Sequence, residues 1–212
     1  MKKLFKLTAL VLVGLLASCG NAGESATDAA AGNAADAAYD NIMTRVSVRD
    51  YEARPVGRDT VELILKAAMQ APSAMKKFPR KYVVVEGAAL DSLRAEFPNA
   101  AHSEGMKKAP LAIVVCGDMS RLDKDEAAAG DGFWVQDCSA AAENILLSAH
   151  ALGLGSCWTG VWPAPGRSAD MARLLSLPES LRPLCAILIG YPGKDVAEAE
   201  PRWNPDDVIW MK

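Results

Sequence analysis

The sequence predicts a small globular domain in which α-helices alternate with short buried strands, so that a thin sheet lies between helices. Three observations predict this arrangement. Of the 212 residues, 50% are hydrophobic and 23% are charged, which is sufficient for one sizeable core. Several segments repeat apolar residues with the helical period, and others are continuous apolar runs short enough to be strands. No internal repeat is present, which argues against a solenoid.

Three segments have the pattern of helices. In the first, Asp59-Thr60-Val61-Glu62 has the form of a capping box, and apolar residues then share one helical face until Ala71-Pro72-Ser73 ends the helix. Residues 88–97 predict a short second helix. The third helix, over residues 134–152, is long and rich in small residues, and the glycines that follow it end it.

Three apolar runs have the length and composition of buried strands. They cover residues 82–85, 111–116 and 184–189. No glycine-rich phosphate loop follows any of them, which excludes a dinucleotide-binding fingerprint and a nucleotide P-loop.

The N-terminus has the organisation of a bacterial lipoprotein signal. Three lysines precede the mostly apolar run 7–16, which is too short to span a bilayer as a relaxed helix. Leu16-Ala17-Ser18-Cys19 then resembles a lipobox, whose cysteine sulfur receives diacylglycerol. An ordinary secretory signal and a short buried helix are the alternatives. We predict a signal peptide at residues 1–18, lipidation at Cys19, and a location in the cell envelope on the extracytoplasmic side of a membrane.

The segment after the signal is expected to be a flexible tether. Residues 19–38 are small or acidic and include no large apolar side chain, so they cannot bury enough surface to offset the entropy of ordering. An alanine-rich helix is the alternative, which Gly23, Gly32 and Asn33 disfavour. From Tyr39 the composition changes, and we predict one folded domain over residues 39–212.

Net charge limits the partners of this domain. The formal charge of the chain is −3, and removal of the signal takes away three lysines and no acids, which leaves −6. The mature protein therefore lacks the basic excess that follows a phosphate backbone, and we predict that it does not bind nucleic acid.

Few side chains are suited to acid–base, nucleophilic or metal chemistry. The only histidines are His102, expected at the surface, and His150, expected to have a hydrogen-bonded structural role. No His-x-x-x-His or Cys-x-x-Cys spacing occurs, so we predict no metal site. No Gly-x-Ser-x-Gly motif occurs either, so we predict no nucleophilic serine of the α/β-hydrolase type. A cofactor is therefore expected to carry any chemistry. The mature domain has four cysteines, interpreted as core residues with any disulfide pairing left open: Cys116, Cys138, Cys157 and Cys185.

One polar segment has the composition of an anion site. In Arg45-Val46-Ser47-Val48-Arg49, two arginines and a serine occupy alternate positions, which share one face of an extended chain. Two guanidinium groups and a hydroxyl on one face suit a phosphate ester. A solvated charged turn explains this segment equally well when it is taken alone.

Three further stretches follow in order. Each is weak by itself, but their joint order and spacing, together with the segment at 45–49, resemble the nitroreductase-like flavoprotein family from about residue 42 to the C-terminus. The stretches are Gln70-Ala71-Pro72-Ser73-Ala74-Met75-Lys76, then Gly153-Leu154-Gly155-Ser156-Cys157-Trp158-Thr159-Gly160-Val161-Trp162-Pro163, then Gly190-Tyr191-Pro192 with Pro201-Arg202-Trp203 after a short gap.

The resemblance implies an α+β fold with a central, mostly antiparallel sheet flanked by helices, in an intertwined homodimer that binds FMN at the subunit interface. It implies FMN-dependent, ping-pong two-electron reduction of a small, planar substrate such as a nitroaromatic or a quinone. No side chain is then expected to be catalytic. The implied cofactor contacts are Arg45, Ser47, Arg49 and Arg202 at the phosphate, Pro72, Ser73 and Ala74 along the ring, and Trp158, Thr159 and Gly160 at its reactive edge.

The chain departs from the family pattern at one place. Where many relatives continue the Pro-Ser corner with Asn-x-Gln-Pro-Trp, this chain has Lys76-Lys77-Phe78-Pro79-Arg80. Lys76 is a candidate flavin contact, because a cation near the ring would stabilise an anionic reduced flavin; a solvent-facing lysine is the alternative.

Two other functions remain open at this stage. One is a specialised branch of the family, for reductive dehalogenation or flavin fragmentation. The other is a lipoprotein that binds a flavin or another small ligand without turning it over. The electron donor is also open, because free nicotinamide nucleotides are scarce outside the cytoplasm.

Overall fold

The computed structural model describes residues 26–97, 106–125, 132–164, 166–194 and 196–212. Its internal contacts divide the chain into two units, Met1–Asp36 and Ala37–Lys212. The predicted signal peptide, Cys19 and His102 lie outside the described residues. Within the described part, no helix is both long enough and apolar enough to cross a bilayer.

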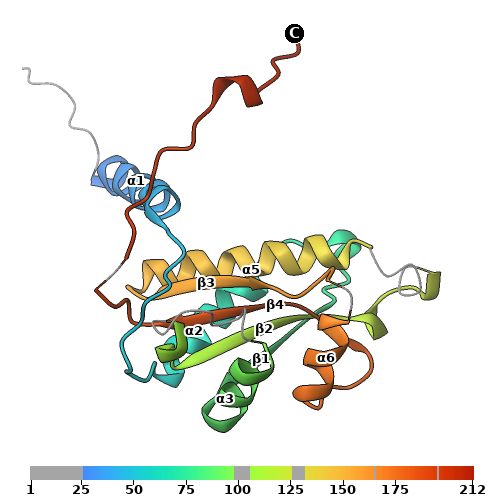
Figure 1. Ribbon diagram of the computed structural model, residues 1–212. Helices are drawn as coiled ribbons and strands as arrows, with labels where there is room; N and C mark the ends of the chain where they lie inside the picture. Colours follow the sequence, from blue (N-terminus) through green and yellow to red (C-terminus); the bar gives the residue numbers. More distant parts are fainter. Residues whose placement is uncertain (1–25, 98–105, 126–131, 165, 195) are drawn as a thin grey trace, which may run out of the picture. The chain divides into compact units, whose positions relative to one another are not determined.

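The second unit is built on one four-stranded sheet. Its strands are β1 (Arg80–Glu86), β2 (Leu111–Asp118), β3 (Gly155–Gly160) and β4 (Leu181–Gly190), in the order β1-β2-β4-β3 (Figure 1). All three neighbouring pairs are antiparallel. The expected α+β class and mostly antiparallel sheet are therefore confirmed.

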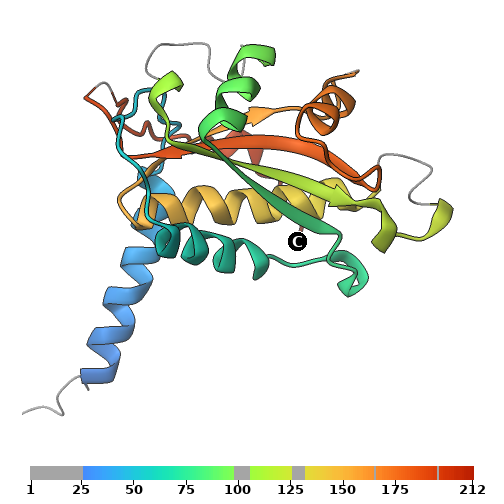
Figure 2. The same ribbon diagram turned by 90° about the horizontal axis from the view of Figure 1, so that it is seen from below.

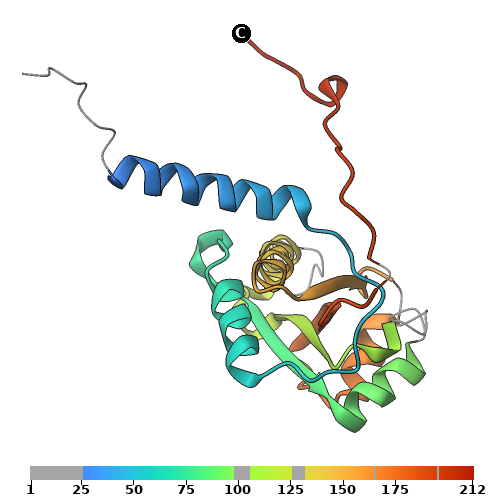
Figure 3. The ribbon, with the colours of Figure 1, turned by 90° about the vertical axis from the view of Figure 1, so that its left-hand side faces the viewer.

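Helices cover both faces of the sheet (Figures 2 and 3). On one face lie α2 (Arg58–Met69) and α5 (Trp134–Ala151), and on the other lie α3 (Gly87–Glu96) and α6 (Arg167–Leu174). Strand β2 is buried along its whole length. Because alternate residues of a strand face opposite sides, this continuous apolar run supplies both cores.

Helix α5 ends as the sequence predicts. Gly153 has a φ of 73°, and the N–H of Leu154 donates to the carbonyl of Ala149 over 2.8 Å. A left-handed glycine followed by this hydrogen bond is the Schellman arrangement. The turn directs the chain back along the sheet as β3, which the sequence reasoning had not recognised as a strand.

The predicted capping box does not form. Helix α2 begins at Arg58, and its cap is Gly57, whose carbonyl accepts hydrogen bonds from Thr60 and Val61. Glu62 does not reach back to a capping residue, because it pairs with Arg58 at 3.0 Å on the outer surface. The helix therefore starts one residue before Asp59, the predicted cap.

The tether prediction is corrected for residues 26–38, which belong to helix α1 (Ala26–Thr44). Eight of these thirteen residues are alanine, the strongest helix former, whereas Gly32 costs only about 1 kcal/mol relative to alanine. The end of the helix is held by tertiary contact, since the Asn41 side chain donates to the carbonyl of Leu147 over 3.1 Å.

Candidate active site

The segment that carries Arg45, Ser47 and Arg49 is fixed against the beginning of β3. The N–H of Val48 donates to the carbonyl of Ser156 over 2.9 Å, and Ser47 and Ser156 form an isolated parallel bridge. The approach is close enough to require glycine at 155, because a Cβ there would lie 2.7 Å from a methyl carbon of Val48.

A buried tyrosine braces the same segment, and the residue after it is bonded to the chain just beyond β4. Tyr51 is 1% exposed, and its hydroxyl donates to the carbonyl of Val48 over 2.7 Å. The main-chain N–H of Glu52 bonds to the carbonyl of Tyr191. The two arginines thus project from a segment that is attached to both β3 and the end of β4.

The charges of both guanidinium groups act on Cys157 in β3. Burial raises the pKa of the Cys157 thiol, and the positive charges of Arg49 and then Arg45 partly oppose this rise. Arg45 is mostly buried and pairs with Glu143 of α5 at 3.8 Å, Ser47 is half-buried, and Arg49 is exposed. The structure therefore brings the predicted phosphate contacts of this segment to one place.

His150 lies at the edge of this cluster in a structural role. Its Nε2 is 2.9 Å from the Thr44 hydroxyl, which donates its proton to the carbonyl of Asp40. The ring nitrogen must therefore be the donor. Partial burial and then the charge of Arg45 lower the pKa of His150, which favours a neutral imidazole at neutral pH.

The predicted ring-facing corner, residues 72–74, is fixed by an acid of α5. Asp137 is 6% exposed, and its two carboxylate oxygens accept from the Ser73 hydroxyl over 2.5 Å and from the N–H of Ala74 over 2.9 Å. Pro72 is exposed, while Ser73 and Ala74 are half-buried.

The other side of the corner is held by a buried cation. Arg80 is 7% exposed, and its guanidinium donates to the carbonyls of Ala71 and Pro72 over 2.8 and 2.9 Å. A longer contact of 3.4 Å reaches the carbonyl of Met69, the last residue of α2. Arg80 therefore supplies hydrogen bonds to carbonyls at the end of α2 and in the corner that follows it.

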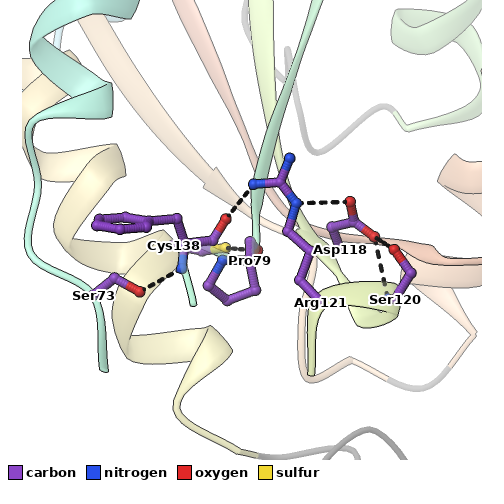
Figure 4. A network of polar contacts seen from close by, with 7 residues as sticks. Ser73, Pro79, Asp118, Ser120, Arg121 and Cys138 are labelled. Carbon is purple, nitrogen blue, oxygen red and sulfur yellow. Dashed lines mark hydrogen bonds and ion pairs between the residues drawn. The ribbon is translucent and has the colours of Figure 1, made fainter. Parts of the chain in front are cut away.

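The loop between the corner and β1 has an unusual backbone. Met75, Lys76 and Phe78 all have φ values between 47° and 56°, which cost about 1–3 kcal/mol each for residues other than glycine. Figure 4 shows the contacts that hold the loop. Its carbonyl at Phe78 accepts from Arg121 over 2.8 Å, and the Cys138 thiol lies 3.7 Å from the carbonyl of Pro79.

Lys76 stays exposed on this loop. Among the described residues, none forms an ion pair or hydrogen bond with its amino group. Its role as a flavin contact therefore remains a prediction.

The outer edge of β3 presents main-chain groups. Because Ser156 directs its carbonyl outward to Val48, Trp158 and Gly160 direct their own N–H and C=O to the same edge. Trp158 and Thr159 are half-buried, Gly160 is exposed, and a Cβ at Gly160 would meet nothing within 4 Å. A flat ligand can therefore approach this backbone closely.

Within the described residues, the corner and the arginine segment contact different residues of α5. The corner touches α5 at Asp137, and the arginine segment touches it at Glu143. These two residues are six positions apart, which places them about 120° apart around the helix. Arg202 is exposed, and no polar contact joins it to the other predicted phosphate ligands within the described residues. A cavity of about 700 Å³ lies elsewhere, between α6 and β4.

The four cysteines of the domain lie in its core. Cys116, Cys138, Cys157 and Cys185 are all buried and unbridged. Burial raises the pKa of both Cys116 and Cys138 to about 12, so almost none of either thiol is ionised at neutral pH. The interpretation as core residues is confirmed. In the described part of the chain, no group of His, Cys, Asp or Glu side chains is placed to hold a metal ion.

Sequence reasoning missed Asp137. The residue falls three positions after Trp134 and four before Ala141, on the buried face of α5. A carboxylate at such a position is a detectable signal, because an acid is almost never fully buried without partners.

Comparison with known proteins shows the family of the chain. The sequence profile described as Nitroreductase family matches residues 42–191. A protein of Methanothermobacter thermautotrophicus, provisionally named an NADH dehydrogenase/NAD(P)H nitroreductase, is 44% identical over 168 residues, which cover 79% of this chain and 83% of the relative.

Solved structures have the same fold. A Bacteroides thetaiotaomicron protein with the same provisional name is 37% identical, with a TM-score of 0.72 over 82% of this chain and 96% of that one. A provisionally named nitroreductase of Desulfovibrio desulfuricans, solved in complex with FMN, is 26% identical, with a TM-score of 0.64 and the same two coverages. The profile match and the 44% identical relative show that this chain belongs to the nitroreductase family.

Proposed function

We propose that this protein is an FMN-dependent oxidoreductase that reduces a small, planar molecule by two electrons. The observation that carries the proposal is the segment 45–49, which bears two arginines and a serine and whose backbone is fixed beside β3. Support also comes from the Desulfovibrio desulfuricans relative in complex with FMN. The raised pKa values of the Cys116 and Cys138 thiols fit chemistry that a cofactor supplies.

The described residues fit this cofactor. Arg45, Ser47 and Arg49 would hold the phosphate, which suits their charge and their fixed backbone. The corner 72–74 and the open edge of β3 at 158–160 would lie along the ring, and the space beside Gly160 permits this. When bound, FMN supplies the two-electron redox chemistry, while the protein orients it and shields it from solvent.

We propose that a second copy of the chain completes the site. The corner and the arginine segment contact different sides of α5 within one chain, and Arg202 stands apart from both. The C-terminal segment that carries Arg202 also exposes large apolar side chains: Trp203 is 76% exposed, Ile209 87% and Trp210 81%. Such a segment is stabilised when it packs against another subunit.

The reaction is proposed to be of the ping-pong type, with donor and acceptor using the same site in turn. The name of the Methanothermobacter thermautotrophicus relative points to NADH or NADPH as donor. Anaerobic titration of the reconstituted protein tests this. We expect NADH or NADPH to bleach the flavin absorbance, and a nitroaromatic or a quinone to restore it.

The same titration distinguishes the alternatives. Bleaching by dithionite alone, with no turnover, supports a protein that binds flavin without catalysis. Bleaching followed by loss of the flavin under oxygen supports the fragmentation branch, and release of halide from a halogenated acceptor supports the dehalogenation branch.

We further propose that the mature protein is anchored by lipid at Cys19. The order of positive charge, apolar run, small residues and cysteine supports the proposal. We expect Cys19→Ser to move the protein from the membrane fraction, because the acyl chains supply the membrane affinity. Fractionation and labelling with a radioactive fatty acid measure this, with Cys116→Ser as the control. Equal membrane binding and labelling of the Cys19→Ser variant would contradict it.

A further inference from the structure

The Asp137 carboxylate meets the corner at two adjacent points. One oxygen accepts from the Ser73 hydroxyl and the other from the N–H of Ala74, at 2.5 and 2.9 Å. Asp137 lies in the first turn of α5, where the helix dipole favours a negative charge. A buried carboxylate with two charge-assisted hydrogen bonds is a strong and directional anchor.

Ser73 passes this constraint on to the loop. A hydroxyl has one proton, and here it is donated to Asp137. The oxygen therefore presents its lone pairs to the loop, and it accepts from the N–H of Phe78 over 2.8 Å (Figure 4). Asp137, Ser73 and Phe78 thus form a chain of hydrogen bonds that closes residues 73–78 into a defined ring.

The closed segment is the one with the strained backbone. Met75, Lys76 and Phe78 all have left-handed φ values. Residues held in such conformations persist only when the surrounding contacts specify them. Without the Ser73 hydroxyl oxygen, the N–H of Phe78 loses the acceptor that holds it in this conformation.

We propose that Asp137 is a positioning residue for the flavin: through the Ser73 hydroxyl it fixes the corner and the loop up to Phe78 in the binding conformation before FMN arrives. This inference rests on the proposed function, because it assigns the corner to the cofactor. Its consequence is that Asp137 acts on FMN affinity without contacting FMN, and that Asp137 and Ser73 act as one unit.

The test uses the full-length protein in three variants. Asp137→Asn keeps the shape of the side chain but replaces one hydrogen-bond acceptor by a donor. Ser73→Ala removes the hydroxyl that links Asp137 to the N–H of Phe78, which we call the relay. The third variant combines both changes. We expect each single change to weaken FMN binding about tenfold. The double variant should bind no more weakly than the worse single variant, because both changes break the same chain of hydrogen bonds. Additive losses would contradict the relay.

Ser73→Thr is the rescue variant. Residue 73 has an extended backbone, with φ −144° and ψ 137°, which a β-branched residue adopts readily. The threonine hydroxyl can make both hydrogen bonds, so we expect Ser73→Thr to bind FMN more tightly than Ser73→Ala does.

Asp123→Asn is the matched control for the acid. Asp123 contacts the same loop through Lys77 at 2.7 Å, but its side chain is 82% exposed. We expect this variant to bind FMN as the wild type does.

Hydrogen exchange in the FMN-free protein supplies a readout that does not depend on the flavin. We expect Asp137→Asn to accelerate amide exchange of the segment 71–80 while the remainder of α5 exchanges as in the wild type. Unchanged exchange of 71–80 would show that Asp137 does not hold this segment. Acceleration throughout α5 would show that Asp137 only stabilises the fold. Wild-type protein that binds no FMN would contradict the proposed function, whereas unimpaired FMN binding by the variants contradicts this inference alone.

Discussion

Replacing both Arg45 and Arg49 by alanine is expected to weaken FMN binding about a thousandfold, which corresponds to about 4 kcal/mol at about 2 kcal/mol per charge-assisted contact. Fluorescence titration of the FMN-free protein measures the dissociation constant. The fold should be little affected, because the ion pair between Arg45 and the half-exposed Glu143 contributes little to stability.

The matched control removes two arginines that lie outside the candidate site. Arg58 and Arg173 are both exposed and both pair with an acid on their own helix. Their double replacement by alanine changes the net charge equally and should leave FMN affinity within about threefold of the wild type, since exposed charges are screened. Equal losses in the two double variants would show that the segment 45–49 has no special role.

Replacing Arg80 by methionine is expected to lower the free energy of unfolding by about 3 kcal/mol. The change keeps much of the side-chain volume but leaves the carbonyls of Ala71 and Pro72 without their donor in a buried place. The free energy of unfolding of Arg80→Lys should lie between those of the wild type and Arg80→Met. An ammonium group keeps the charge but cannot reproduce the planar fork of a guanidinium. Urea unfolding of the FMN-free protein measures the effect.

Lys81→Met is the control for this experiment. Lys81 is the next residue of β1 and is exposed. Its replacement should change the free energy of unfolding by less than about 0.5 kcal/mol. If Arg80→Met is as stable as Lys81→Met, the hydrogen bonds from Arg80 to the corner contribute nothing to the stability of the fold.

Much of the fold could be predicted from local pattern. The apolar runs at 111–116 and 184–189 predict buried strands, and both form central strands of the sheet. The long helix was predicted with its end at Gly153, because a left-handed glycine after a periodic segment is a local signal.

The missed elements depend on tertiary partners. β3 has glycine at both ends and reads as a turn, and it becomes a strand because β4 supplies its hydrogen bonds. Helix α6 buries only Ser168 and Met171, which is too weak a pattern to recognise. The helix over residues 26–38 was rejected on its glycine and asparagine, although alanine content outweighed them.

The candidate site shows the same division. Arg45, Ser47 and Arg49 could be proposed as a group because alternation along an extended segment is visible in sequence. Two side chains hold the corner. Asp137 is 64 residues from Ser73, and Arg80 is 8 residues from Pro72, so only the fold brings each pair together.

The flavin content of the purified wild-type protein tests the central claim most directly. The full chain is incubated with excess FMN, freed of unbound ligand, and analysed for FMN and protein. We predict a yellow protein with about one FMN per chain, because each chain contributes one arginine segment and one corner. A colourless protein that retains no FMN after this treatment would contradict the assignment of these residues to a flavin.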